Sequence, residues 1–142
     1  MVSVQKTDNE QALETVFQIR QKVFVEEQNV PHEEEYDEFE NIAAHYLASY
    51  NGEPAGVARW RETDKGVKLE RFAVLENFRN KAVGSHILKR VLQDVKEAHP
   101  GKTVYLHAQF RAIPFYERHG FQKVGDQFTE CEIEHFKMVL QA

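Results

Sequence analysis

The feature that most constrains the fold is a long amphipathic segment between two strand-like apolar runs. Residues 67–75 and 103–108 are apolar and rich in β-branched and aromatic side chains, which favours buried strands. Between them, residues 83–98 carry apolar side chains at the spacing of one helix face. Two strands that a helix connects within one sheet lie parallel to each other. The sequence therefore predicts a strand–helix–strand unit with a parallel pair.

The rest of the chain predicts antiparallel pairing around this unit. Asn51-Gly52 is a strong hairpin turn and residues 64–66 turn again, so three strands form a meander. A capping box from Thr7 to Glu10 introduces an amphipathic helix. The expected strands are 2–6, 41–50, 55–63, 67–75, 103–108, 121–124 and 132–140, and the expected helices are 8–24, 83–98 and 113–119, with room for a short helix within 33–40. This order predicts one α/β domain over residues 1–142, with a mixed, mostly antiparallel sheet and flanking helices.

The composition limits the kinds of partner that the chain can have. Its 142 residues suffice for one hydrophobic core. The net charge of −5 argues against a general nucleic-acid binder, and the single cysteine, Cys131, excludes an internal disulfide or a cysteine-rich metal site. The N-terminal residues do not resemble a signal peptide, and no apolar run approaches the ~20 residues of a membrane span. We therefore expect a cytoplasmic protein with no nucleic-acid and no membrane partner.

One segment of the chain is strongly acidic. Eight carboxylates lie between residues 26 and 40, with no Lys or Arg among them. Such a segment is commonly a solvated loop, but its electrostatic field also attracts a cationic ligand. Both interpretations are open from the sequence.

A small, basic loop leads into helix 83–98. It consists of Arg79, Asn80, Lys81, Ala82, Val83, Gly84 and Ser85. The first N–H groups of a helix have no partner within it and lie at the positive end of its dipole, so the loop favours a phosphate-bearing ligand. A simple tight turn explains the same residues equally well. The phosphate fingerprints G-x-G-x-x-G and G-x-x-x-x-G-K-[ST] do not occur in the chain.

Several motifs of this chain resemble those of the GNAT family of N-acetyltransferases. Arg79-x-x-Ala82-x-Gly84 resembles the family's R/Q-x-x-G-x-G/A loop, with Ala82 in place of the first Gly. Residues 71–75 look like the family's fourth strand, and residues 112–121 look like its A-x-x-F-Y-x-x-x-G-F segment. With the early run 23–28, the resemblance spans roughly residues 10 to 140 and is greatest to the small bacterial ElaA- and YjcF-like members. An Ala at position 82 is tolerable at negative φ and costly at positive φ.

This resemblance implies a single-domain acyl-CoA N-acyltransferase fold, in which the two parallel strands splay apart and admit the pantetheine arm of acetyl-CoA. It also implies acetyl transfer to a primary amine of a small molecule or peptide, by direct attack in a ternary complex and without a metal. Main-chain groups of Phe72, Ala73 and Val74 would pair with the pantetheine and the thioester oxygen. The N–H groups of the loop would take the pyrophosphate. Small members of the family often dimerise through their last strands, so a homodimer is a further expectation.

The resemblance also suggests catalytic residues. Tyr116 lies in the A-x-x-F-Y segment, where its phenol would sit near the CoA sulfur and protonate the leaving thiolate; the alternative is an aromatic ring that only packs on the sheet. The general base stays open. Its candidates are Glu70, Glu27, His45 and His135, and a chain of water molecules would need none of them. His135 falls in an E-x-x-I-x-H-x-x-M pattern that the ElaA- and YjcF-like members share.

Other readings of the same residues remain. A non-catalytic acyl-CoA sensor would share the fold and would not need Tyr116, and a nucleotide-binding regulatory domain would use the same helix N-terminus. Cys131 is either an acetyl-accepting nucleophile or a small loop residue, and no activating cluster surrounds it in the sequence. His32 with the adjacent glutamates, and His107 with His135, lack a metal-ligand spacing such as H-E-x-x-H.

Overall fold

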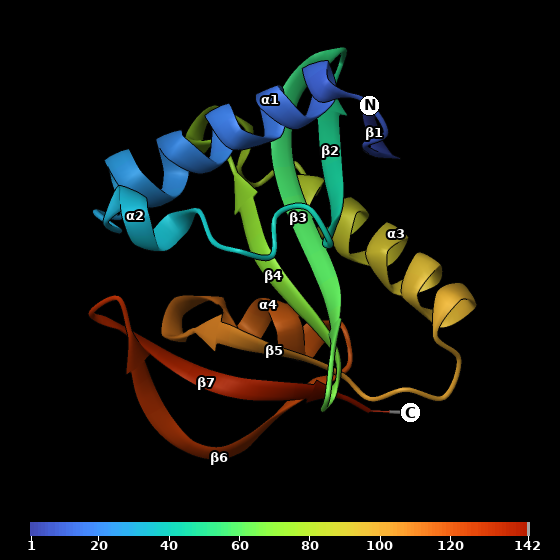
Figure 1. Ribbon diagram of the computed structural model, residues 1–142, viewed down its shortest axis with the longest axis vertical. Helices are drawn as coiled ribbons and strands as arrows, with labels where there is room; N and C mark the ends of the chain where they lie inside the picture. Colours follow the sequence, from blue (N-terminus) through green and yellow to red (C-terminus); the bar gives the residue numbers. More distant parts are fainter. Residues whose placement is uncertain (142) are drawn as a thin grey trace.

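Seven strands form one mixed sheet in the computed structural model, which describes residues 1–141 (Figure 1). Their order is β1-β2-β3-β4-β5-β7-β6, and within these residues only β4 and β5 pair in parallel. The strands are β1 (Val2–Lys6), β2 (Ala44–Tyr50), β3 (Glu53–Thr63), β4 (Gly66–Val74), β5 (Val104–Gln109), β6 (Phe121–Glu130) and β7 (Ile133–Leu140). The helices are α1 (Glu10–Arg20), α2 (His32–Glu35), α3 (Val83–Ala98) and α4 (Ile113–Arg118), with the π-helix η1 (Gln21–Glu27) and the 3-10 turns η2 (Glu76–Phe78) and η3 (Phe110–Ala112). The predicted mixed sheet with flanking helices is confirmed.

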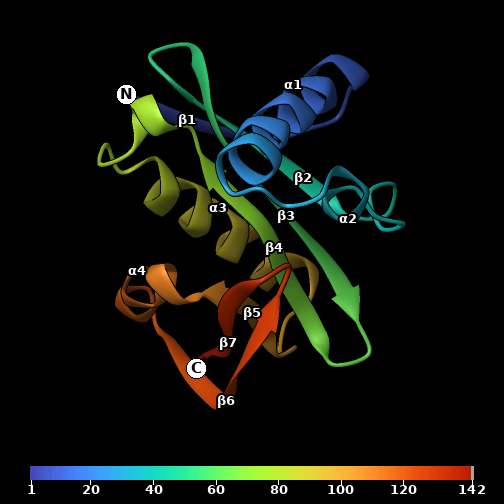
Figure 2. The ribbon, with the colours of Figure 1, turned by 90° about the vertical axis from the view of Figure 1, so that its left-hand side faces the viewer.

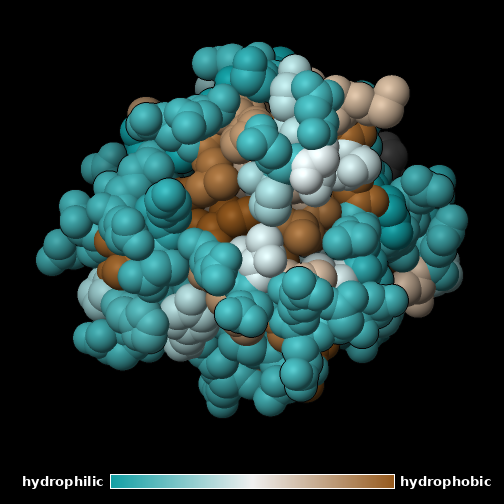
Figure 3. Space-filling view, turned by 90° about the horizontal axis from the view of Figure 1, so that it is seen from above, coloured by the Kyte–Doolittle hydropathy of each residue, from teal (hydrophilic) through white to brown (hydrophobic). Residues whose placement is uncertain are grey.

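Helices lie on both faces of the sheet (Figures 1 and 2). Because side chains alternate along a strand, each face builds its own core. The core on the α1 face contains Val16, Ile19, Val23, Leu47, Val57 and Ala73. The core on the α3 face is larger and includes Val83, Ile87, Leu88, Val91, Ala58, Leu69, Leu106 and Met138. Seen from above, the margin of the molecule is largely hydrophilic, and the largest group of hydrophobic side chains in view lies near the middle (Figure 3).

The parallel pair is short. β4 and β5 pair only from Val67 opposite Val104 to Leu69 opposite Leu106, although each strand continues beyond that point. The sheet therefore opens there, and the predicted parallel pair that splays at one end is confirmed.

A β-bulge in β4 lies at the opening. Between the pairs Arg59–Glu70 and Val57–Ala73, β4 has two residues where β3 has one. The first of the two, Arg71, has a left-handed φ of 56°. A bulge bends its strand and increases the local twist. The bend in β4 thus coincides with the end of its pairing with β5.

The start of α1 differs from the prediction. The helix begins at Glu10, and its cap is Asn9 rather than Thr7. Asn9 Oδ1 accepts the N–H of Ala12 at 2.8 Å, which satisfies one of the free donors at the helix start. The capping box predicted from Thr7 is therefore wrong by two residues.

Two further boundaries also differ. The predicted helix 8–24 changes after Arg20 into the π-helix η1, in which the N–H of Gln28 bonds to the carbonyl of Val23 at 3.0 Å. β6 continues to Glu130 rather than ending at residue 124. An irregularity in its pairing between Val124 and Phe128 breaks the alternation by which a strand is predicted.

Two buried arginines hold part of the acidic segment against the sheet. Arg20 of α1 and Arg59 of β3 are 1% and 0% exposed. Their guanidinium groups donate to the carboxylates of Glu35, Asp37, Glu40 and Glu70 at 2.6–2.9 Å. Buried charges are stable only when paired in this way. Much of residues 35–40 is therefore an internal set of counter-ions rather than a solvated loop.

We predict that stability is lost in acid as this network is protonated. Burial would raise the pKa of each carboxyl, but hydrogen bonds and attraction from the arginines outweigh it and hold the pKa of Asp37 and Glu70 at about 2. Unfolded carboxyls titrate at about pH 4, so this stability is fully present above about pH 4 and is lost as the pH falls towards about 2. Urea midpoints across that range measure the effect. A midpoint that does not change would contradict the assigned role of the network.

Candidate active site

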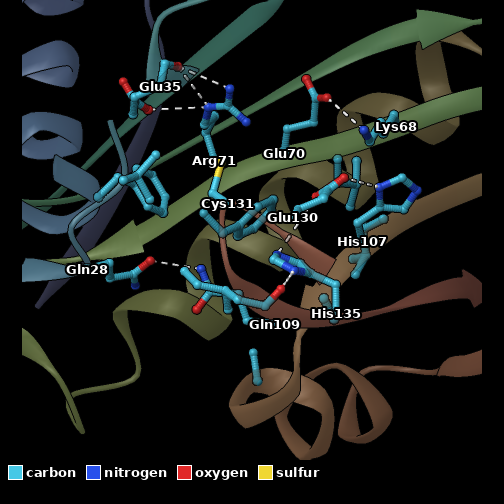
Figure 4. Close-up of a pocket in the computed structure, with 18 of the residues that line it drawn as sticks. Gln28, Glu35, Lys68, Glu70, Arg71, His107, Gln109, Glu130, Cys131 and His135 are labelled. Carbon is cyan, nitrogen blue, oxygen red and sulfur yellow. Dashed lines mark hydrogen bonds and ion pairs between the residues drawn. The ribbon is translucent and has the colours of Figure 1, made fainter. Parts of the chain in front are cut away.

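A cavity of about 200 Å³ lies where β4 and β5 separate (Figure 4). η1 and the α2 segment contribute to its wall, as do α4 and the turn between β6 and β7. Its lining combines apolar side chains, such as Phe24, Phe72 and Ile133, with carboxylates, imidazoles and amides. An apolar pocket with a few convergent polar groups is the usual form of a small-molecule site.

The cavity brings together three of the five predicted catalytic residues. Tyr116, Glu70 and His135 all line it. His45 and Glu27 do not belong to its lining. The five residues therefore do not form one constellation.

Tyr116 is both a packing residue and a cavity residue. Its ring makes edge-to-face contacts with Phe72, Phe115 and Phe121 at centroid distances of 5.1–6.2 Å. Burial raises its pKa above that of a free tyrosine. The phenol is therefore protonated at neutral pH, which is the state that a proton donor needs.

Glu70 is unsuited to accept a proton. Its carboxylate lies 2.8 Å from Arg59, 3.0 Å from Arg61 and 3.2 Å from Lys68. Although burial would raise its pKa, these cations lower the pKa to about 2. Glu70 thus anchors positive side chains beside the cavity and stays ionised at neutral pH.

His135 presents an unprotonated nitrogen to the cavity. Its Nδ1 lies 2.7 Å from the carbonyl oxygen of Ile133, and because a carbonyl only accepts, Nδ1 carries the proton of the neutral ring. The lone pair is then on Nε2, which lies 3.9 Å from Oε2 of Glu130. An imidazole in this tautomer can accept a proton at Nε2, which is the role of a general base.

His45 and Glu27 are engaged elsewhere. His45 is 5% exposed, and its Nε2 lies 2.9 Å from the carbonyl oxygen of Glu40. Burial lowers its pKa, so the ring is neutral. Glu27 forms a two-pronged ion pair with Arg79 at 2.7 and 2.9 Å, and this hydrogen bonding lowers its pKa. The predicted catalytic roles of both residues would need a different arrangement.

The loop before α3 has an unusual backbone. Asn80 and Ala82 have left-handed φ values of 64° and 63°, and Ala82 directly precedes the first residue of α3, Val83. An Ala at this position would be tolerable at negative φ, but the φ of Ala82 is positive. The backbone is therefore strained here, because the Cβ of Ala clashes with it where a Gly would not. Left-handed residues in such a loop turn successive N–H groups into a shared concavity that attracts anions.

The side chains of this loop are less available than its backbone. Besides its pair with Glu27, Arg79 donates to the carbonyl of Val74 at 2.9 Å. Lys81 Nζ lies 5.6 Å from the centre of the Tyr50 ring. The positive character of the loop therefore comes largely from N–H groups at the start of α3.

Sequence reasoning missed several polar residues of the cavity. Glu130 and His107 meet beside His135. Across the cavity, Nε2 of Gln109 on β5 donates to Oε1 of Gln28, the residue that follows η1, at 2.9 Å (Figure 4). The signal that could have found them is register: Gln109 lies opposite His135 in the β5–β7 ladder, so residues two apart on these strands share its face.

Residues 1–141 contain neither a candidate metal centre nor a helix suited to crossing a membrane. In that part of the chain, no three or more His, Cys, Asp or Glu side chains are grouped so that they could hold a metal ion. None of its helices has the length and apolar character needed to cross a bilayer.

The fold and the cavity can be compared with known proteins. The family model for the acetyltransferase (GNAT) domain matches residues 4–142. YjcF of Bacillus subtilis, an uncharacterised N-acetyltransferase, is 41% identical over 133 residues, which are 92% of this chain and 94% of YjcF. The crystal structure of Escherichia coli ElaA has a TM-score of 0.85 at 28% identity and covers 99% of this chain and 100% of its own. The crystal structure of a Bacillus subtilis acetyltransferase in complex with CoA has a TM-score of 0.69 at 16% identity. The match covers 99% of this chain and 97% of that protein. Because the family model spans nearly the whole chain, and YjcF matches over nearly the same length, this chain belongs to the GNAT family of acetyltransferases.

Proposed function

We propose that this chain binds acetyl-CoA in the opening between β4 and β5 and transfers the acetyl group to a primary amine by direct attack in a ternary complex. The observation that carries the proposal is the end of strand pairing at Leu69 and Leu106. Within residues 1–141, β4 continues past Leu69 without pairing to β5. The edge of Phe72, Ala73 and Val74 that faces β5 therefore has no strand partner. The amides of a pantetheine arm supply the N–H and C=O groups that such an edge requires.

The pyrophosphate of the cofactor would lie on the loop Arg79–Ser85. The left-handed backbone at Asn80 and Ala82 and the free N–H groups at the start of α3 both favour an anion. Recognition through the main chain depends little on side-chain identity, which explains how Ala82 can replace a family Gly. The relative that was solved in complex with CoA shares this fold and supports the assignment.

The side chains of the cavity would then move the protons. Acetyl-CoA supplies an acyl group on a thiol leaving group. Tyr116 would donate a proton to that thiolate, because its phenol is protonated and lines the cavity. His135 would take a proton from the amine, because its Nε2 carries a lone pair, whereas Glu70 is held ionised by three cations. A water chain remains the alternative base.

A non-catalytic acyl-CoA sensor is the competing function. It would bind the thioester in the same opening without turnover. Release of CoA thiol from acetyl-CoA, measured with a panel of alkylamines, polyamines, amino sugars and peptides, separates the two. Turnover with any amine supports the enzyme, and binding of acetyl-CoA without turnover across the panel supports the sensor. The cytoplasmic location, the homodimer and the single domain over residues 1–142 stay predictions.

Replacing Ala82 with Asp should abolish binding of acetyl-CoA without harming the fold. Asp tolerates left-handed backbone better than Ala, and its charge is favourable at the start of α3, so the free protein keeps or gains stability. The same charge repels a pyrophosphate. The control Ala82→Asn is neutral and nearly isosteric. Acetyl-CoA should raise the melting temperature of the parent and of Ala82→Asn, but not of Ala82→Asp. Equal shifts in all three proteins would place the phosphates elsewhere.

Replacing Tyr116 with Phe keeps the ring and removes only the hydroxyl. If the phenol protonates the thiolate, kcat should fall by about 10²–10⁴-fold, while the affinity for acetyl-CoA stays the same. Tyr105→Phe is the control, because Tyr105 is equally buried and its hydroxyl bonds to Thr63 outside the cavity. An unchanged kcat, with chemistry shown to be rate-limiting, would leave Tyr116 with its packing role alone.

A further inference from the structure

Glu130 lies between two imidazoles at the cavity (Figure 4). Its Oε1 is 3.1 Å from Nδ1 of His107, and its Oε2 is 3.9 Å from Nε2 of His135. The sheet produces this arrangement, because Glu130 pairs with Ile133 and His135 follows two residues later on the same face of β7. Phe128 completes the cluster, with its ring edge-on to His107 and stacked on His135.

When the His135 ring is neutral, the two atoms that face each other across the 3.9 Å gap are both acceptors. His135 donates from Nδ1 to Ile133, so Nε2 of the neutral ring has a lone pair. Glu130 is ionised at neutral pH, because the hydrogen bond from His107 lowers its pKa more than burial raises it. A carboxylate oxygen and an imidazole lone pair do not bond to each other. A group that donates to both atoms would be held between them.

A protonated amine fits this gap. A nitrogen at about 2.9 Å from each of two acceptors is an ordinary hydrogen-bond donor to both, and acceptors 3.9 Å apart allow that position. An alkylammonium carries three N–H groups and one positive charge. It therefore satisfies both acceptors at once and offsets the charge of Glu130.

We propose that Glu130 Oε2 and His135 Nε2 form the binding site for the acceptor nitrogen, and that the acceptor is an aliphatic primary amine that binds as its ammonium. His107 is a positioning residue, since its Nδ1–H fixes the carboxylate of Glu130. The proposal rests on the proposed acetyl transfer, and it names the substrate class for that reaction. Arylamines, which are neutral at neutral pH, would be poor substrates.

The proton balance agrees with this site. The ammonium gives one proton to Nε2 of His135 and becomes a nucleophilic amine. Its nitrogen then forms a bond to the thioester carbonyl carbon, and the C–S bond breaks. The thiolate takes a proton from Tyr116, and the second proton that the nitrogen loses restores the phenol. Each turnover therefore releases one proton. That proton departs from Nε2 of His135 to solvent, next to the half-exposed Glu130.

The other charges around the site leave it negative. Lys68 of β4 attracts Glu130, but its ammonium is 3.2 Å from Glu70. Glu34 of the α2 segment accepts from the thiol of Cys131 at 3.4 Å and adds a second carboxylate nearby. Burial, together with the carboxylates of Glu34 and Glu130, raises the pKa of that thiol, and Arg71 opposes the effect. These groups favour a cation.

Nitrogen NMR of the imidazoles tests the site without acetyl-CoA. At about pH 8 free imidazoles are neutral and an alkylamine stays protonated. Ethylamine and trifluoroethylamine are the probes, because they are similar in size but only ethylamine is an ammonium there. Ethylamine should shift the Nε2 resonance of His135, and trifluoroethylamine should not. Equal responses to both amines, or no response to ethylamine, would overturn the proposal.

Glu130→Gln removes the charge and keeps the size, and Glu134→Gln is its matched control. Glu134 is the neighbour of His135 on β7 and is exposed on the other face. The ethylamine response should disappear in Glu130→Gln and persist in Glu134→Gln. A response that survives in Glu130→Gln would overturn the role of the carboxylate. His107→Phe should weaken the response, and an unchanged response would remove His107 from the site.

Turnover separates this proposal from the proposed function. With an alkylamine that the panel identifies, Glu130→Gln should raise the amine KM about tenfold or more, while the KM for acetyl-CoA stays unchanged. An unchanged amine KM would overturn the ammonium site and leave the acetyltransferase standing. Ammonium-specific NMR responses in a protein without turnover would sustain the site and count against the enzyme.

Discussion

The ion pairs of Arg20 and Arg59 are the interaction on which the rest of the structure depends. They link α1 and β3 to the carboxylates of residues 35–40 and to Glu70 of β4. The aromatic rings of Tyr36 and Phe39 pack against Phe17 and Arg61, and the ion pairs add the polar contacts that keep the segment close to the sheet. Because it is held there, Glu34 and Glu35 become part of the cavity wall. Breaking one member of such a buried set is costly, since it leaves an uncompensated charge in the interior.

The periodic parts of the chain were predictable from sequence, and pairings between distant segments were not. Helix 83–98 was predicted with its observed limits, because its apolar face repeats over sixteen residues without interruption. The parallel pair followed from the helix that connects its strands. The pairing of the acidic segment could not be predicted, because a run of carboxylates gives no sign of the buried Arg20 and Arg59 that face it. Similarly, Asn9 and Thr7 are both good caps, and only the packed helix decides between them.

The site was predictable where a motif covered it. Tyr116 and His135 were found through short patterns, and both line the cavity. A motif also predicts a role for Glu27, but this residue pairs with Arg79 on the surface. From the sequence, Glu130 is only the first residue of the E-x-x-I-x-H-x-x-M pattern, and His107 is only a candidate metal ligand. Their significance comes from the register of β5, β6 and β7, which three-dimensional pairing sets and which a linear pattern does not contain.

The extra residue in β4 has a consequence for how such a protein could arise. Deleting Arg71 would leave Glu70 opposite Arg59 and Ala73 opposite Val57, so the ladder with β3 would become regular on both sides of the deletion. The sheet itself does not require that residue. A regular β4 would lose the local bend, and its edge could continue to pair with β5 past Leu69. One extra amino acid in β4 therefore favours an open edge between β4 and β5 over a continuous one. Such an insertion is a single step for evolution, and it is reversible.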